Sequence, residues 1–234
     1  MKYGKILVLV VNVAIVSMAG YLYSNKIAED NSLIQQAEAK KHQLELDNQA
    51  KQAELEKQKQ AILELAKLKA DRERELERIQ NEKEAVLAAL KTKDFKKQAE
   101  CLAKNIYFEA RNEGIPGQRA IAWVTMNRTA NDKYPHTVCG VVYQAKVDKK
   151  GTPFRDKCQF SWFCDGKGDK IRDKKAWDVA LYIAADVMLK FGKETDPTGG
   201  ATMYHADYVD PFWVDSYTRT VQIDDHIFYE DKKG

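Results

Sequence analysis

The stretch 24–98 contains no glycine, no proline and a single aromatic residue, Phe95. Alanine, leucine, glutamate, glutamine and lysine dominate it, and these residues favour the α-helix. The stretch therefore predicts one long helix. At a rise of 1.5 Å per residue, such a helix reaches about 100 Å.

Apolar residues follow a seven-residue repeat along this stretch only in part. Ile34, Leu55 and Ile62 occupy one core position of the repeat, whereas Lys41 and Asn48 occupy the same position in other heptads. Polar core residues weaken a coiled coil and can set its register. We expect an imperfect coiled-coil stalk that spaces the C-terminal domain from a membrane, with a homodimer as one outcome. A solvated charged helix without a spacing role is the alternative.

An uncharged run precedes the helical stretch. Residues 6–23 carry no charged side chain and follow Lys2 and Lys5. This pattern is typical of a membrane segment whose N-terminus stays inside. It predicts a single-pass protein of the cytoplasmic membrane with its C-terminal domain in the periplasm. Ser17 and Ala19 also fit a signal-peptidase site, so an exported soluble form is one alternative and a buried core helix is another.

The remaining region has the composition of a folded domain, so the chain divides into 1–23, 24–98 and 99–234. All four cysteines and all five prolines lie after residue 100. The net charge is only +3, from 38 basic and 35 acidic residues, which does not indicate a nucleic-acid partner. We expect an α+β domain, with helices near 99–112, 116–130 and 174–190 and strands near 200–206 and 218–229.

Four cysteines in an exported domain predict two disulfides. Three pairings are possible. Cys158 and Cys164 can bond across the short loop between them, which leaves Cys101 to pair with Cys139. A four-cysteine zinc site is the alternative, although the close pairs of cysteines typical of structural zinc are absent from the sequence. We expect no cofactor.

Spacing on the first helix of the domain singles out one carboxyl group. Leu102, Ile106, Glu109 and Glu113 recur at steps of four, three and four residues, which places Glu109 on the apolar face. Burial, the helix C-terminus and the neighbouring carboxylate all raise the pKa of Glu109. A carboxyl group still protonated near neutral pH can act as a general acid. A buried ion pair with Arg111, Arg119 or Arg128 is the alternative.

Six motifs follow one another in a fixed order: NIYFEARNEGIPGQ (105–118), AIAWVTMNR (120–128), YPHTVCGVVYQ (134–144), CQFSW (158–162), DPTGGATMYH (196–205) and HIFY (226–229). Together they resemble the spore cortex-lytic, SleB-type family of cell-wall hydrolases. The resemblance covers roughly residues 99–229 and excludes the uncharged run and the long helix. The sequence departs from the family pattern at Asn112 and Gly114, where members often have glycine and proline.

The resemblance implies a fold related to lysozymes and lytic transglycosylases, acting on peptidoglycan glycan strands with Glu109 as the acid. Glu109 would protonate the oxygen between N-acetylmuramic acid and N-acetylglucosamine. It would then accept the proton of the muramic acid 6-hydroxyl, which leaves a 1,6-anhydro end. A hydrolase would instead need a second carboxylate across the scissile bond, whereas Glu113 lies beside Glu109 on the same helix.

Substrate binding is predicted for further side chains that can bond to or stack on sugars: Glu113, Gln118, Ser161, Tyr204, His205 and Trp213. Packing or turn capping is the alternative, because most aromatic residues serve the core. Two other functions stay open. One is a zinc amidase that uses His136, His205 and His226. The other is a noncatalytic wall-binding or envelope-spanning protein.

Overall fold

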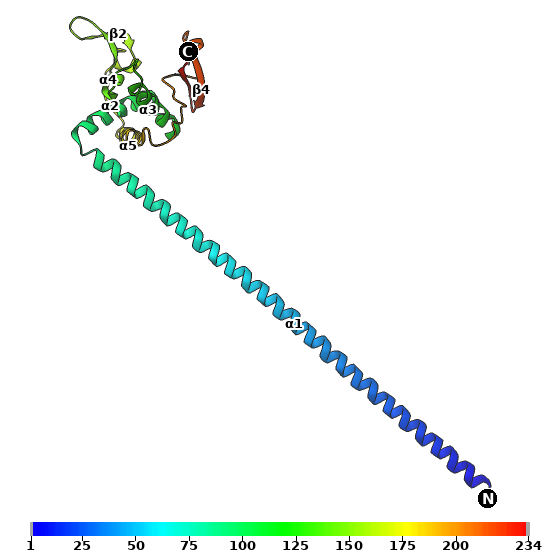
Figure 1. Ribbon diagram of the computed structural model, residues 1–234. Helices are drawn as coiled ribbons and strands as arrows, with labels where there is room; N and C mark the ends of the chain where they lie inside the picture. The colour runs from blue at the N-terminus through cyan, green and yellow to red at the C-terminus, as the bar shows by residue number, and fades with distance from the viewer. Residues whose placement is uncertain (1, 233–234) are drawn as a thin grey trace. The chain divides into compact units, whose positions relative to one another are not determined.

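The structure is a computed structural model that describes the backbone of residues 2–232 and the side chains of residues 14–232. It divides into two units, Met1–Glu75 and Leu76–Gly234. Figure 1 shows a helix over the first unit and a mixed α and β structure over the second. The elements are α1 (Lys2–Ala89), α2 (Lys93–Ala110), α3 (Ile115–Thr129), α4 (Val138–Val142), β1 (Ala145–Val147), β2 (Pro153–Cys158), η1 (Ser161–Phe163), α5 (Lys174–Lys190), β3 (Met203–Ala206), η2 (Val214–Ser216), β4 (Tyr217–Ile223) and β5 (His226–Asp231).

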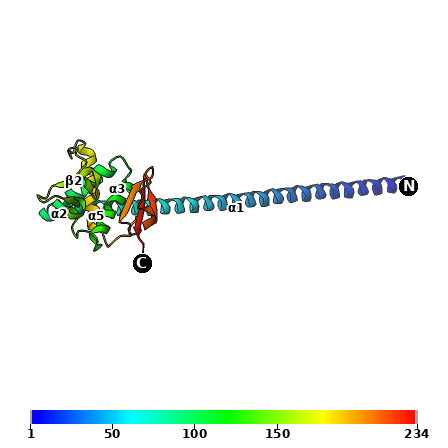
Figure 2. The same ribbon diagram turned by 90° about the horizontal axis from the view of Figure 1, so that it is seen from above.

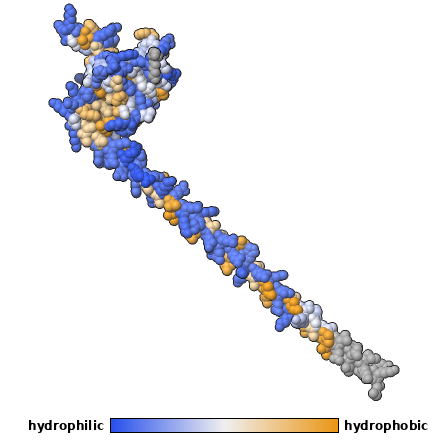
Figure 3. Space-filling model, viewed as in Figure 1, coloured by the Kyte–Doolittle hydropathy of each residue, from blue (hydrophilic) through white to orange (hydrophobic). Residues whose placement is uncertain are grey.

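The predicted long helix is present as α1. Its side chains pair along the helix, as Lys59 does with Glu56 at 2.8 Å and the Gln43 amide with Asp47 at 2.9 Å. Each such exposed pair stabilises a helix by only about 0.3–0.5 kcal/mol. Apolar residues such as Ile62 are exposed and scattered among hydrophilic ones (Figure 3). The role of a stalk stays a prediction.

Helix α1 ends before the predicted limit near residue 98, and α2 begins after a short turn. Val86, Leu90 and Phe95 pack with Ala185 of α5 around this turn. A straight helix would carry these side chains away from α5, whereas the turn buries them, at about 25 cal/mol per Å² of apolar surface. The last turns of α1 therefore belong to the compact unit.

The predicted membrane segment, 6–23, lies within α1, and its side chains up to residue 13 are outside the described residues. Among the residues that the structure does describe, no helix has a stretch long and apolar enough to span a membrane. The segment stays a prediction.

Helices α2, α3 and α5 surround the main core of the compact unit. Leu102 and Ile106 of α2, Trp123 of α3 and Ile183 and Val187 of α5 are buried together. These positions recur at helical spacing, so each helix presents an apolar face to the others. The packing fixes the C-terminal end of α2, which carries Glu109.

A three-stranded antiparallel sheet, in the order β3-β5-β4, packs on α3 through Phe228, Ile121 and Val124 (Figure 2). The strand region predicted over 218–229 is in fact a hairpin, because Asp224 and Asp225 turn the chain between β4 and β5. Asp224 has a φ of 47°. Aspartate tolerates this left-handed conformation, so the turn needs no glycine.

The antiparallel β1–β2 hairpin and the short helix α4 were not predicted. Most residues of β2 are exposed. Its sequence therefore does not need the alternation of apolar and polar residues by which a half-buried strand is predicted. Two disulfides secure this region. They join Cys101 to Cys139 and Cys158 to Cys164, which are the pairs that the spacing favoured.

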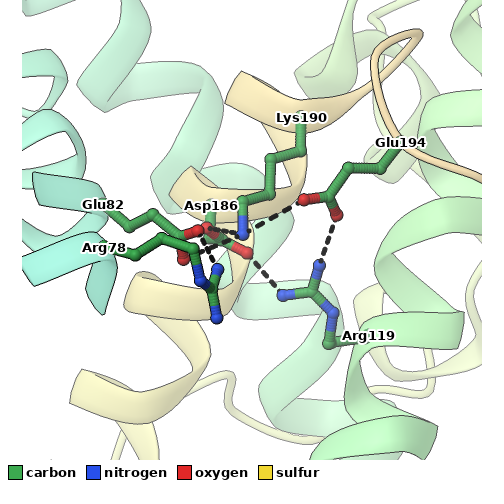
Figure 4. A network of polar contacts seen from close by, with 6 residues as sticks. All are labelled: Arg78, Glu82, Arg119, Asp186, Lys190 and Glu194. Carbon is green, nitrogen blue, oxygen red and sulfur yellow. Dashed lines mark hydrogen bonds and ion pairs between the residues drawn. The ribbon is translucent and has the colours of Figure 1, made fainter. Parts of the chain in front are cut away.

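A network of ion pairs joins α1, α3 and α5 within the compact unit (Figure 4). The Asp186 side chain is 5% exposed and pairs with Arg119 and, at 3.1 Å, with Lys190. Lys190 also lies 3.2 Å from Glu82 of α1 and 3.3 Å from Glu194. The network therefore holds the end of α1 against α5.

Candidate active site

A groove passes Glu109 at the C-terminal end of α2. It consists of two adjoining cavities of about 810 and 320 Å³, whose linings share Glu109, Ser161 and Tyr204. Arg128 and Trp213 line the smaller cavity. A polymer that occupies both cavities therefore contacts Glu109.

The Glu109 carboxyl group is half-buried in this groove. Its Oε2 atom accepts a hydrogen bond from the Tyr204 hydroxyl at 3.0 Å. Burial raises the pKa of Glu109 and outweighs this hydrogen bond and the charges of His226 and Arg128, which lower it. Repulsion by Glu113 adds to the increase. Glu109 thus keeps its proton to higher pH than a free glutamate, as a general acid requires.

The three arginines considered as ion-pair partners of Glu109 have other contacts. The Arg111 guanidinium lies 5.2 Å from the centroid of the Tyr107 ring. Arg119 belongs to the Asp186 network, and the Arg128 Nε donates to a backbone carbonyl at 2.7 Å. Within the described residues, Glu109 forms no ion pair in the 4.0 Å range.

Arg128 is a buried cation beside the acid. Its guanidinium lies 5.4 and 5.0 Å from the ring centroids of Tyr134 and Phe160, and its Nε donates to the Thr202 carbonyl at 2.7 Å. These contacts compensate in part for the desolvation of the charge. Arg128 favours the carboxylate form of Glu109, so it would stabilise the anion that a proton transfer from this acid leaves.

The loop before β3 positions Tyr204. The Asn127 amide of α3 donates to the Asp196 carboxylate at 2.8 Å. That carboxylate also accepts from the backbone N–H groups of Thr198 and Gly200, both at 2.7 Å. Gly200 has a φ of 84°, which glycine adopts without strain. The motifs at 120–128 and 196–205 therefore meet in space, and β3 carries Tyr204 to the acid.

A second cluster joins the α2–α3 connection to the β4–β5 turn. Glu113 Oε1 lies 2.5 Å from His226 Nδ1, and the Gly117 N–H donates to Asp224 at 2.9 Å. A Cβ atom on Gly117 would lie 2.1 Å from Glu113 Oε2, so a larger residue there would displace the Glu113 side chain. The His226 ring meets the Tyr204 ring edge-on, with centroids 5.2 Å apart. Glu113 thus supports Tyr204 through His226.

Buried polar contacts fix one wall of the groove. The Trp162 indole N–H donates to Asn105 Oδ1 at 3.1 Å, and the Asn105 amide donates to Thr125 at 3.2 Å. The Trp162 ring stacks on Phe108, next to Glu109, with centroids 4.8 Å apart. The motifs at 105–118, 120–128 and 158–162 meet at these contacts.

The structure brings most of the predicted substrate-binding residues to the groove. Glu113 and His205 line the larger cavity, Trp213 lines the smaller one, and Ser161 and Tyr204 line both. Both ring nitrogens of His205 have protein partners, the Ala206 carbonyl at 2.8 Å and the Tyr229 hydroxyl at 2.9 Å.

Gln118 does not line either cavity. Its side chain is buried and donates to the Glu113 carbonyl at 3.0 Å, which completes the connection between α2 and α3. Conversely, sequence reasoning missed Arg128 as a groove residue. The sequence named Arg128 only as a possible ion-pair partner of Glu109, and the further signal was its charge at the end of the apolar stretch 120–126.

The candidate zinc ligands are divided between different elements. His205 lies in β3 and His226 in β5, whereas His136 precedes α4 and lies 3.3 Å from the Thr129 carbonyl. In the part of the chain that the structure describes, no three His, Cys, Asp or Glu side chains are placed to hold a metal ion.

The fold and the groove define a small α+β domain that presents the Glu109 carboxyl group, with its raised pKa, where two cavities meet, an arrangement suited to acid–base cleavage. A family model described as Cell Wall Hydrolase matches residues 112–229. The chain belongs to this family of cell wall hydrolases, and the predicted family resemblance is confirmed. The match begins three residues after Glu109, so the role of Glu109 rests on the NIYFEAR motif and the geometry above.

Two curated relatives are spore cortex-lytic enzymes. The protein of Halalkalibacterium halodurans is 30% identical over 128 residues, which are 54% of this chain and 33% of the relative. The protein of Oceanobacillus iheyensis is 28% identical over 128 residues, which are 54% of this chain and 39% of the relative. The chain thus spans little more than a third of their length.

Two solved structures are also similar. The catalytic domain of the Bacillus cereus SleB protein is 25% identical, with a TM-score of 0.41, and the match covers 58% of this chain and 91% of that one. The catalytic domain of SleB from Bacillus anthracis, described as a germination-specific lytic transglycosylase, is 25% identical. Its TM-score is 0.42, with 57% of this chain and 93% of that one covered.

Proposed function

We propose that the compact unit cleaves peptidoglycan glycan strands between N-acetylmuramic acid and N-acetylglucosamine, as a lytic transglycosylase. The observation that carries the proposal is Glu109, a half-buried acid with a raised pKa where two cavities meet. The family assignment supports a cell-wall polymer as the substrate.

In this mechanism Glu109 acts first as an acid and then as a base. Its proton passes to the bridging oxygen as the bond to C1 of N-acetylmuramic acid breaks, and N-acetylglucosamine leaves with a free hydroxyl. Arg128 and the Tyr204 hydroxyl stabilise the carboxylate. The muramic acid 6-hydroxyl then attacks C1 and gives its proton to Glu109. The acid is restored, and no water is consumed.

The surroundings of Glu113 support a mechanism with one carboxylate. A hydrolase needs a second carboxyl group across the scissile bond, about 5–9.5 Å from the first. Glu113 is instead next to His226. Asp165, Asp169 and Asp225 also line the larger cavity, so they are the residues to examine if the products carry hydrated ends.

Mass spectrometry of fragments released from purified peptidoglycan by the full chain tests the proposal. Anhydro-muramic ends support a lytic transglycosylase, and hydrated reducing ends indicate a muramidase or glucosaminidase. Released peptides with intact glycan would indicate an amidase. No release by a folded chain would favour a wall-binding role.

Glu109→Gln should reduce release at least 1000-fold, within the range for loss of a general acid, and should preserve strand binding. Its melting temperature should not fall at neutral pH. The raised pKa means that the native state binds more protons than the unfolded state, so ionisation of Glu109 destabilises the fold as pH rises. Glu100→Gln, on the same helix, is the matched control. Unchanged release by Glu109→Gln would exclude Glu109 as the acid.

We further propose that the N-terminal segment anchors the enzyme in the cytoplasmic membrane, with the compact unit outside and α1 as a stalk that can dimerise. The uncharged run 6–23 after Lys2 and Lys5 and the paired cysteines support this arrangement. Protease added to intact spheroplasts should cleave the compact unit from the membrane fraction. Full protection of the compact unit would contradict the proposal.

A further inference from the structure

A third cavity lies at the base of the β1–β2 hairpin. It measures about 310 Å³ and is lined by Gln144, Ala145, Lys146, Lys157, Cys158 and Gln159. Gln159 also lines the smaller cavity of the groove, so the two cavities adjoin. We propose that this lysine pocket binds a carboxylate of the stem peptide attached to the glycan strand. The inference rests on the function proposed for the groove.

Two positive charges lie together in the lysine pocket without a compensating acid. Lys146 follows Ala145 and Lys157 precedes Cys158, and these two neighbours are paired across the hairpin. The strand register shifts between Ala145 and Val147, so the two lysines flank the Ala145–Cys158 pair without being paired with each other, and like charges in one pocket repel each other. An anion between the two ammonium groups would remove this repulsion and accept a charge-assisted hydrogen bond from each.

The acidic residues of the hairpin are engaged elsewhere. Asp148 accepts from the backbone N–H groups of Lys150 and Thr152, both at 2.8 Å, and so closes the hairpin loop. Asp156 lies 3.8 Å from Arg155. Among the side chains described, no carboxylate lies within 4.0 Å of Lys146 or Lys157.

A third group of the pocket suits a ligand that carries a hydrogen-bond donor beside its anionic group. The Oε1 atom of Gln144 is buried and has no hydrogen-bond partner within the described part of the chain. A buried amide oxygen is more stable when it accepts a hydrogen bond. A stem peptide offers a carboxylate for the lysines and, once the Gln144 side chain rotates toward the pocket, an amide N–H for this oxygen.

The lysine pocket is fixed relative to the groove. The Gln159 N–H donates to the Gln144 carbonyl at 2.8 Å, and the Cys158–Cys164 disulfide closes the segment that carries Ser161. The N-acetylated sugars of a strand are uncharged, so its stem peptides carry the carboxylates. A strand in the groove therefore presents its charges to a pocket beside the strand.

Binding by the full chain carrying Glu109→Gln tests the inference, because this variant should hold strands without cutting them. The ligands are soluble, uncross-linked glycan strands with stem peptides and the same strands after carbodiimide coupling to ammonia, which converts carboxylates to amides. The parent, which is the chain that carries Glu109→Gln alone, should bind untreated strands about tenfold more tightly than amidated strands, as expected for charged hydrogen bonds. Adding Lys146→Ala and Lys157→Ala should remove this preference.

The matched control carries Lys149→Ala and Lys150→Ala, which remove the same charge at the hairpin tip and should keep the preference. Amidation of the strand and the two pocket substitutions remove the same interaction. Their losses of binding affinity should therefore not add. Equal binding of both strands by the parent would overturn the inference. A pocket variant that weakens both strands equally would also overturn it.

Peptide-stripped strands, which retain the lactyl carboxylate, complete the test. Binding as tight as that of peptide-bearing strands would overturn the assignment to the stem peptide. Fragment release by the chain with Glu109 intact judges the proposed function separately. Release with no charge preference would leave that function standing without the inference. A charge preference without release would support carboxylate binding by the lysine pocket and contradict the proposed cleavage.

Discussion

Helix α1 and the compact unit depend on contacts of very different range. The Lys59–Glu56 pair of α1 joins residues three positions apart. At the groove, the Tyr204–Glu109 and Gly117–Asp224 hydrogen bonds join residues 95 and 107 positions apart. Local contacts can be lost one at a time, whereas the long-range contacts depend on one another. We therefore expect α1 to tolerate substitutions that would damage the compact unit.

The strongest test of this contrast is Asp186→Ala. The change leaves Arg119 and Lys190 without their buried partner, and removal of one side of a buried ion pair costs about 3 kcal/mol or more. Chemical denaturation followed by tryptophan fluorescence measures the loss, because all four tryptophans lie in the compact unit.

Asp178→Ala is the control on the same helix. Asp178 pairs with Lys174 at 2.5 Å, but the two side chains are 55% and 81% exposed, so the loss should be below about 1 kcal/mol. Equal losses of unfolding free energy for the two variants would show that the buried network stabilises the fold no more than an exposed ion pair does.

Gly117→Ala should have the next largest effect. The added Cβ would lie 2.1 Å from Glu113 Oε2 and 2.6 Å from Asp224 Oδ2. Overpacking of this kind costs about 1–3 kcal/mol. Because it separates Glu113 from His226, fragment release should fall with the melting temperature.

Gly20→Ala in α1 is the counterpart, since no atom lies within 4 Å of its added Cβ. Alanine favours a helix by up to about 1 kcal/mol over glycine, so helicity should be unchanged or increased. A tolerated alanine at position 117 would contradict the close packing around Gly117.

The same difference in range decides what the sequence predicts. The helix over 24–98 depends on local composition, and it was predicted except at the turn after Ala89, where packing on α5 decides. Glu109 was found because its apolar neighbours recur on the same helix. Tyr204 was predicted as a substrate-binding residue, but its hydrogen bond to Glu109 was not predicted, because no local pattern relates two residues 95 positions apart.

The errors also have physical causes. Gln118 has a side chain suited to sugar binding, yet its amide is used by the Glu113 carbonyl. The turn at Asp224 was missed because aspartate replaces the glycine usual in such hairpins. Neither fact can be read without the tertiary contacts.

Tyr204→Phe separates the electrostatics of the groove from its packing. The Tyr204 hydrogen bond lowers the pKa of Glu109, so its removal should raise that pKa further. The active form is protonated, and activity is lost as pH rises through this pKa. The alkaline limb of kcat/KM should therefore move to higher pH.

The maximum rate of Tyr204→Phe should fall about tenfold, as expected when one hydrogen bond to a charged group is lost. Release of labelled fragments across a pH series measures both effects. Tyr208→Phe, at an exposed position of the larger cavity, is the control. An alkaline limb that moves to lower pH would contradict the role assigned to Tyr204.

The smallest effect is expected for Glu56→Gln in α1. Its 2.8 Å pair with Lys59 joins side chains that are 64% and 59% exposed, so the substitution should change stability by less than about 0.5 kcal/mol. Salt screens exposed charges, and 1 M NaCl should remove even this difference. Far-ultraviolet circular dichroism of the full chain measures the helix. If Glu56→Gln melts a large part of it, the helix depends on contacts beyond its local pairs, as in a coiled coil, and the contrast with the compact unit does not hold.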